Sequence, residues 1–138
     1  MSKGHDKYIE RVGLISSLGK PLARRSGSCC ELCLQCSVPL SPWEVPPFEE
    51  EPVPERAVFI CDTCKQQIRN PKKLDANHWH CLHKTVWSEE PAVKVTALLV
   101  LHYLSSEEWV QALLEQVYLS PEESEWVDSA LEICQGHL

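Results

Sequence analysis

The clearest pattern of apolar and polar positions lies in the last third of the chain. From residue 91 onward apolar side chains recur every three or four positions, which is typical of amphipathic α-helices. Pro91 suits the first position of such a helix, because no N–H group is needed there, and the pattern extends to about Leu104. The side chains expected to face inward are Val93, Ala97, Leu98, Leu101 and Leu104.

Two capping-box patterns predict two further helices. A serine followed three positions later by a glutamate can satisfy the free N–H groups at a helix start. Ser105 with Glu108 predicts one helix, and Ser120 with Glu123 predicts another that continues through Leu131. The apolar sides are formed by Trp109, Leu113, Leu114 and Val117 in the first, and by Trp126, Ala130 and Leu131 in the second.

The start of the chain also shows helical spacing. Apolar residues at positions 8, 9, 12, 15 and 18 predict an amphipathic helix over 5–18 that ends at Gly19-Lys20-Pro21. One or two helical turns are expected over 22–25, before Ser-Gly-Ser at 26–28 breaks the chain.

The middle of the chain is rich in proline and glutamate. Residues 37–56 hold six prolines, which excludes a long helix. Residues 43–45 are expected to form a short strand, and the apolar run 57–60 predicts a second strand that leads into Cys61.

The composition is that of a folded protein. A hydrophobic fraction of 43% argues against wholesale disorder, and 138 residues suffice for one domain or for a small metal module with a helical appendage. No apolar run approaches the ~20 residues that cross a bilayer. The charged first residues lack the apolar region of a secretory signal. We therefore expect a cytoplasmic protein that has no membrane partner.

The net charge of −7 is unevenly distributed. Residues 1–27 and residues 65–84 each carry a net charge of +4, whereas residues 89–138 carry −9. Ordinary solvated faces that attract one another would explain this pattern. The functional alternative is a basic surface, formed by the N-terminal and 65–84 segments, that binds nucleic acid.

Eight cysteines in a reducing compartment indicate metal or redox chemistry. Cys30 and Cys33 form one CxxC pair, Cys61 and Cys64 form another, and 27 residues separate the two. Two such pairs can place four thiolates around one tetrahedral Zn²⁺, and a site closed by four protein ligands is structural rather than catalytic. Cys36 is the main rival to Cys30, because Cys33 and Cys36 also form a CxxC pair. Buried cysteines without metal, or a redox dithiol, would also be consistent with these motifs.

Several segments carry a family pattern: RSGSCCELC at 25–33, WEVPP at 43–47, CDTC at 61–64, NHWHCL at 77–82 and VWSEEPAV at 86–93. Over roughly residues 22–130 the chain resembles the PhnA protein family, in its proteobacterial N-terminal region. This resemblance implies a bacterial zinc-ribbon-like module whose activity is not established, with an operon context linked to alkylphosphonate use.

The resemblance also bears on the choice of ligands. In this family the first knuckle, which is the turn that holds one CxxC pair, begins with CELC and matches Cys30 to Cys33. The family sequence usually continues with glycine, where this chain has Leu34. The residues that depart from the family pattern are Cys29, Cys36, His80 and His83.

The order of knuckle, loop, strand and knuckle is also similar to the treble clef of HNH nucleases. Those enzymes need a histidine base in the loop, but residues 34–60 contain no histidine, and Lys65 follows Cys64 where a histidine is usual. Glu44 alone, with a reference pKa of about 4.3, is a weak base at neutral pH. The similarity therefore implies shape without nuclease chemistry.

A histidine-rich run raises the question of a second metal site, formed by His78, His80, Cys81 and His83. The alternative is that the histidines face solvent while their apolar neighbours pack the helical tail onto the metal module. The five tryptophans could stack nucleic-acid bases, although most are expected in the core. His102 is expected to be partly exposed rather than catalytic.

Together these patterns predict an α+β fold with three parts: a basic helical segment (1–27), a zinc-bound treble-clef or ribbon module (28–74), and a connecting segment with a helical tail (75–138). The favoured function is a non-enzymatic zinc-binding interaction module with an unknown protein partner. Nucleic-acid binding is the first alternative. A metal-dependent hydrolase of phosphorus compounds, suggested only by the operon name, is the second.

Overall fold

The computed structural model describes residues 11–48 and 50–136, with side chains up to residue 134. It is a mixed structure of helices and one two-stranded sheet, so the predicted α+β class is confirmed. The elements in chain order are α2 (Gly19–Ser26), β1 (Leu40–Glu44), η1 (Pro54–Arg56), β2 (Ala57–Cys61), α3 (Asp62–Arg69), η2 (Pro71–Lys73), η3 (His78–Cys81), α4 (Leu82–Thr85), α5 (Pro91–Tyr103), α6 (Glu108–Gln116) and α7 (Pro121–Gly136). No helix within the described residues has the length and apolar character needed to cross a bilayer.

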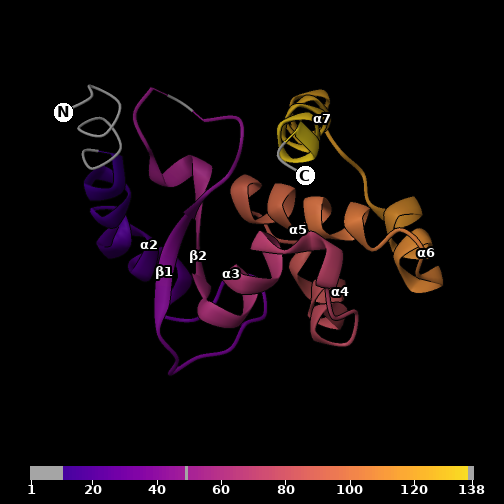
Figure 1. Ribbon diagram of the computed structural model, residues 1–138, viewed down its shortest axis with the longest axis horizontal. Helices are drawn as coiled ribbons and strands as arrows, with labels where there is room; N and C mark the ends of the chain where they lie inside the picture. Colours follow the sequence, from indigo (N-terminus) through magenta and orange to yellow (C-terminus); the bar gives the residue numbers. More distant parts are fainter. Residues whose placement is uncertain (1–10, 49, 137–138) are drawn as a thin grey trace.

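The two strands form an antiparallel hairpin in which Leu40 lies opposite Cys61 and Glu44 opposite Ala57. The strand predicted over 57–60 is confirmed as β2, which extends one residue further, to Cys61. The first was predicted over 43–45, but it begins at Leu40 and includes Pro42. Proline is tolerated there because each strand of a two-stranded sheet has a free edge. Every residue of β2 is buried, since the hairpin lies between α2 and α5 (Figure 1).

The N-terminal helices differ from the prediction. Residues 11–16 are helical, and the earlier part of the predicted helix over 5–18 lies outside the described residues. The predicted stop at residues 19–21 is wrong, because α2 begins at Gly19. Pro21 sits in its first turn, where the missing N–H group costs no hydrogen bond. The helix ends at Gly27, whose φ of 66° is the left-handed conformation common after helices.

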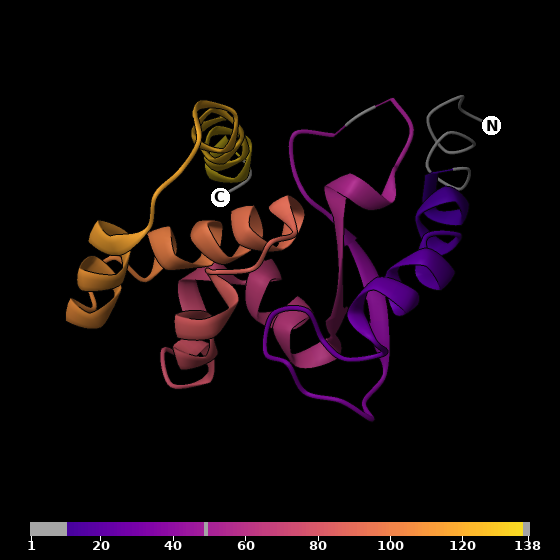
Figure 2. The same cartoon turned by 180° about the vertical axis from the view of Figure 1, so that it is seen from behind.

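The three helices of the tail were predicted close to their observed bounds. Helix α5 is buried on nearly all sides, because α4 and α7 lie on opposite sides of it and the hairpin covers its first turns (Figure 2). The capping box of Ser120 and Glu123 forms as predicted, with reciprocal backbone contacts of 3.2 Å and 3.0 Å. The predicted box of Ser105 and Glu108 does not form. Glu107 occupies the N-cap of α6 instead, because its N–H donates to the Leu104 carbonyl and extends the turn.

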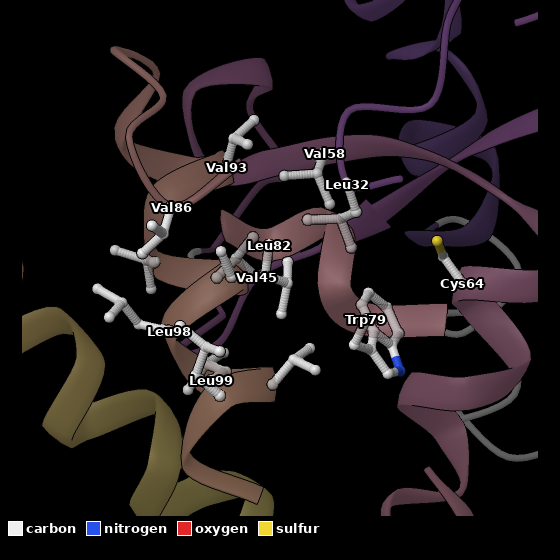
Figure 3. Close-up of a cluster of buried hydrophobic side chains, with 14 of the residues drawn as sticks. Leu32, Val45, Val58, Cys64, Trp79, Leu82, Val86, Val93, Leu98 and Leu99 are labelled. Atoms are coloured by element: carbon white, nitrogen blue, oxygen red, sulfur yellow. The ribbon is translucent and has the colours of Figure 1, made fainter. Parts of the chain in front are cut away.

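One continuous apolar core joins the cysteine-rich part of the chain to the helical tail. Figure 3 shows Leu32, from the loop of the first cysteine pair, and Val58 of β2 gathered with Val86 and Val93. Trp79 is fully buried, and its indole N–H donates to Gln67 of α3 at 3.1 Å. The core therefore crosses the boundary that the sequence placed between residues 74 and 75.

Candidate metal centre

The four cysteines of the two CxxC pairs come from three elements. Cys30 and Cys33 lie on the loop before β1, Cys61 ends β2, and Cys64 lies in the first turn of α3. A hydrogen bond of 2.9 Å from the Glu31 N–H to the Phe59 carbonyl holds the loop beside β2. The Sγ atoms of Cys30 and Cys64 are 3.7 Å apart, and those of Cys33 and Cys61 are 3.6 Å apart.

These distances suit a tetrahedral tetrathiolate site. All four sulfur atoms lie within 4.8 Å of one another, and the group could hold a metal ion. Zn–S bonds of about 2.3 Å in a tetrahedron require S···S edges of about 3.8 Å, close to the two short separations above. Three of the four side chains are buried, so water would not compete for the ion. The donor set and its geometry therefore fit Zn²⁺.

The backbone of the first knuckle is folded around the Cys30 sulfur. The N–H groups of Cys33 and Cys61 each lie 3.4 Å from Cys30 Sγ, and such contacts stabilise a thiolate. The Leu34 N–H donates to the Cys30 carbonyl at 2.9 Å, which closes the turn. Leu34 takes a φ of 68°, a conformation that favours glycine. This explains in physical terms why a glycine suits that position.

The ionisation of the metal-free cluster is uneven. The hydrogen bond shared with Cys64, together with the two backbone N–H groups, lowers the pKa of Cys30 to about 4. Burial raises the pKa of Cys33 to about 12. The pKa of Cys64 is also raised, first by its hydrogen bond with Cys30 and then by burial. The Cys30 thiolate is thus stable without a metal ion, whereas the positive charge of an ion would favour the ionisation of Cys33 and Cys64.

The histidine-rich run divides between two places rather than forming a second metal site. His78 Nε2 lies 3.3 Å from Cys64 Sγ, at the edge of the four-cysteine group. His80 and His83 instead stack on Trp109, with ring centroids 4.4 Å and 4.9 Å away. Cys81 is half-buried, and burial raises its pKa to about 11. Among the described residues, only the four CxxC cysteines form a group of three or more candidate ligands.

Cys36, the rival ligand, is paired elsewhere. It forms a disulfide with Cys29, which the sequence reasoning did not expect. The two residues face each other in an isolated antiparallel bridge at the two ends of the knuckle loop, with Cα atoms 4.2 Å apart. Their side chains therefore meet each other and leave the knuckle to Cys30 and Cys33.

The two residues inside the first CxxC motif have structural roles that sequence reasoning missed. The Glu31 carboxylate accepts from the Phe59 N–H at 2.8 Å and pairs with Arg25 of α2 at 2.7 Å. The Leu32 side chain is fully buried, and its carbonyl accepts a 2.6 Å hydrogen bond from the Thr85 hydroxyl. The knuckle is thereby tied to α2, to β2 and to α4.

Other candidates from the sequence lie apart from this centre. Glu44 forms an ion pair with Arg11, so its carboxylate is already engaged. Trp79 is buried, and Trp87, at 51% exposure, is the one tryptophan that is mostly exposed. His102 is exposed on α5, as expected.

Comparisons with known proteins leave the family open. No family model matches the chain, and neither a curated protein nor a solved structure matches it.

Proposed function

We propose that this chain is a zinc-binding protein whose Zn²⁺, held by Cys30, Cys33, Cys61 and Cys64, is structural. The observation that carries the proposal is the convergence of four sulfur atoms, from three elements, within 4.8 Å. When bound, the ion supplies the charge that lets the buried thiols ionise together, and it fixes the loop, β2 and α3 relative to one another.

The module is best described as a treble clef. A knuckle loop with two ligands is followed by the β1–β2 hairpin, and the other two ligands lie where β2 ends and α3 begins. The N-terminus of α3 lies at these two ligands, and the positive end of a helix dipole complements the negative charge that thiolates carry when they hold a metal ion. The order of elements and the position of the ligands support this assignment, and we extend the proposal to membership of the PhnA family.

The ligand set supports a non-catalytic role for the metal. Four thiolates close the coordination shell of Zn²⁺ and leave no position for a water or substrate. Glu44, the carboxylate that could replace a nuclease base, is occupied by Arg11. We therefore propose an interaction module that acts through its surface. Release of phosphate from a phosphonate by the purified protein, abolished in a metal-site variant, would contradict this view.

Nucleic acid is the alternative partner. The observation that supports this alternative is the set of exposed basic side chains. Lys20 and Arg24 are exposed on α2, and Lys72 and Lys73 are exposed after α3. Against it, Arg25 is used internally, where it donates to the carbonyls of Pro54 and Ala57 and pairs with Glu31. A gel shift whose affinity falls steeply with salt would move the proposal to nucleic acid.

The zinc proposal is tested by metal analysis of matched variants. The purified chain should contain about one zinc per molecule. Cys64→Ser should lose the metal, whereas Cys134→Ser, which changes a half-buried cysteine on α7, should retain it. Absence of zinc from a metal-replete preparation, or equal zinc content in the two variants, would overturn the proposal.

A further inference from the structure

An apolar pocket of about 230 Å³ lies between the hairpin, α3 and the two long tail helices. Its floor is one stripe of α5, formed by Thr96, Leu99, Val100 and Tyr103, which follow the spacing of a single helix face. The pocket lies where the cysteine-rich part of the chain meets the helical tail. Junctions of this kind are preferred positions for small-molecule sites.

The walls of the pocket are held in place by contacts outside it. The Trp126 indole N–H of α7 donates to the Pro46 carbonyl at 2.8 Å, and the Arg56 guanidinium lies 4.3 Å from the Trp126 ring. Lys94 of α5 pairs with Glu123 of α7 at 3.2 Å. The first two contacts hold α7 against the segment after β1 and against η1, and the third holds α7 against α5. The position of Ile133 on the pocket is therefore set by the fold.

Two polar side chains that line the pocket, Tyr103 and Arg69, are hydrogen-bond donors. The Tyr103 hydroxyl is buried without a hydrogen-bond partner within the described part of the chain. Cys134, which also lines the pocket, is the polar neighbour of this hydroxyl, and its contact adds to the effect of burial in raising the Tyr103 pKa. Arg69 is exposed and lines the pocket without an ion pair among the described residues. No acidic side chain is among the described residues that line the pocket.

We propose that this pocket binds a small amphipathic acid, with an apolar body between α5 and the hairpin and a carboxylate that accepts from Arg69 and Tyr103. A dry cavity of about 150 Å³ accommodates benzene, so this larger one suits a body of roughly eight to ten carbons. A buried hydroxyl without a partner is costly, and a ligand oxygen would remove that cost. The unpaired guanidinium favours an anion over a neutral or cationic molecule.

Octanoate is a suitable probe, with octanol and octylamine as matched molecules of the same chain length. The zinc-loaded full chain would be titrated with each and followed by ¹H–¹⁵N NMR. Octanoate should produce saturable shifts at Thr96, Leu99 and Arg69, octanol weaker ones, and octylamine none. Equal binding of octanoate and octanol would overturn the assignment of an acid, and non-saturable shifts spread over the surface would overturn the site.

Single-residue variants test whether Arg69 and Tyr103 contact the carboxylate of the ligand, independently of any effect on folding. Arg69→Gln should weaken octanoate about three- to fivefold, the range expected for an exposed charge pair. Tyr103→Phe should also weaken it, whereas Lys72→Gln, a nearby exposed lysine that does not line the pocket, should leave it unchanged. Zinc content checks that each variant is folded. If Arg69→Gln and Lys72→Gln bind octanoate equally, the proposal fails.

A second copy of the chain is the other possible occupant, and the same spectra distinguish it. The pocket signals would then shift when the protein alone is diluted, in parallel with a change of mass in sedimentation. We expect no shift on dilution. A concentration-dependent shift that octanoate does not compete away would overturn the small-ligand assignment.

Discussion

Leu34 is the residue at which the local backbone and the side chain conflict most clearly. Its φ of 68° is left-handed, and its side chain is 46% exposed, so the leucine gains little burial for that strain. A non-glycine residue in this conformation costs roughly 1–2 kcal/mol. The knuckle requires the conformation, because the chain must turn at Leu34 to bring the Gln35 carbonyl to the Cys30 N–H, which donates to it at 2.9 Å.

Leu34→Gly should therefore raise the free energy of unfolding by about 1 kcal/mol. Urea unfolding of the zinc-loaded protein, with excess zinc present, measures the change. Gln35→Gly is the matched control, since Gln35 is exposed and does not have a positive φ. It should lower the stability by a few tenths to about 1 kcal/mol. Equal destabilisation by both substitutions would contradict the strain at Leu34.

Thr85 is a second residue whose role the sequence conceals. It is 3% exposed, and its hydroxyl donates to the Leu32 carbonyl, which lies 53 positions earlier. Thr85→Val keeps the shape but leaves that carbonyl without this donor, which should cost about 1–3 kcal/mol of stability. Thr96→Val is the control, because the buried Thr96 hydroxyl bonds only within its own helix, to the Ala92 carbonyl. Chemical denaturation should show the larger loss for Thr85→Val.

At the scale of elements, the two capping-box patterns have different outcomes. Both read Ser-x-x-Glu, yet only Ser120 and Glu123 form reciprocal bonds, while α6 starts after an uncapped Glu107. The difference arises in the preceding turn. Pro121 fixes the start of α7, whereas the chain after α5 continues to turn through Leu104 before α6 begins.

Ser120→Ala should accordingly destabilise the protein by about 1 kcal/mol, the usual effect of losing an N-cap hydroxyl. Ser105→Ala should change the stability by no more than about 0.5 kcal/mol, because this exposed side chain caps no helix. Thermal unfolding followed by circular dichroism compares the two. A larger loss from Ser105→Ala would show that α6 begins one turn earlier than the structure places it.

At the scale of the whole molecule, the proposed zinc centre and the helical tail share one core. Leu32 and Cys64 belong to the same buried cluster as Leu98 and Leu101 of α5. Helix α5 is apolar on nearly all sides, so it would not be stable in water if its contacts with β2 and α4 were lost. Loss of the metal should therefore affect the tail as well as the knuckle.

Chelation of the zinc should unfold the chain in one cooperative transition. The far-ultraviolet helix signal and the tryptophan fluorescence should change together as chelator is added, and both should recover when zinc is restored. If the helix signal survives chelation, the tail folds alone, and the division into 28–74 and 75–138 would describe independent units.

The sequence alone predicted those features that depend on neighbours along the chain. These are the two CxxC pairs, the apolar strand 57–60, and the start of α5 and α7 at their prolines. The helix α3 was missed because its apolar side is too short to show a helical pattern. Its helical form is favoured by contacts with β2 and with Trp79, which lies later in the chain.

Only the tertiary structure decided which distant groups meet. It brings the two cysteine pairs to within 4.8 Å, assigns Cys36 to Cys29, and directs His78 alone of its run towards Cys64. It also places Glu31 between Arg25 and β2 and leaves a pocket under α7. Turns, caps and spacings are short-range preferences that a sequence displays directly. Contacts between residues tens of positions apart depend on how whole elements pack, and that packing is set by the shared core.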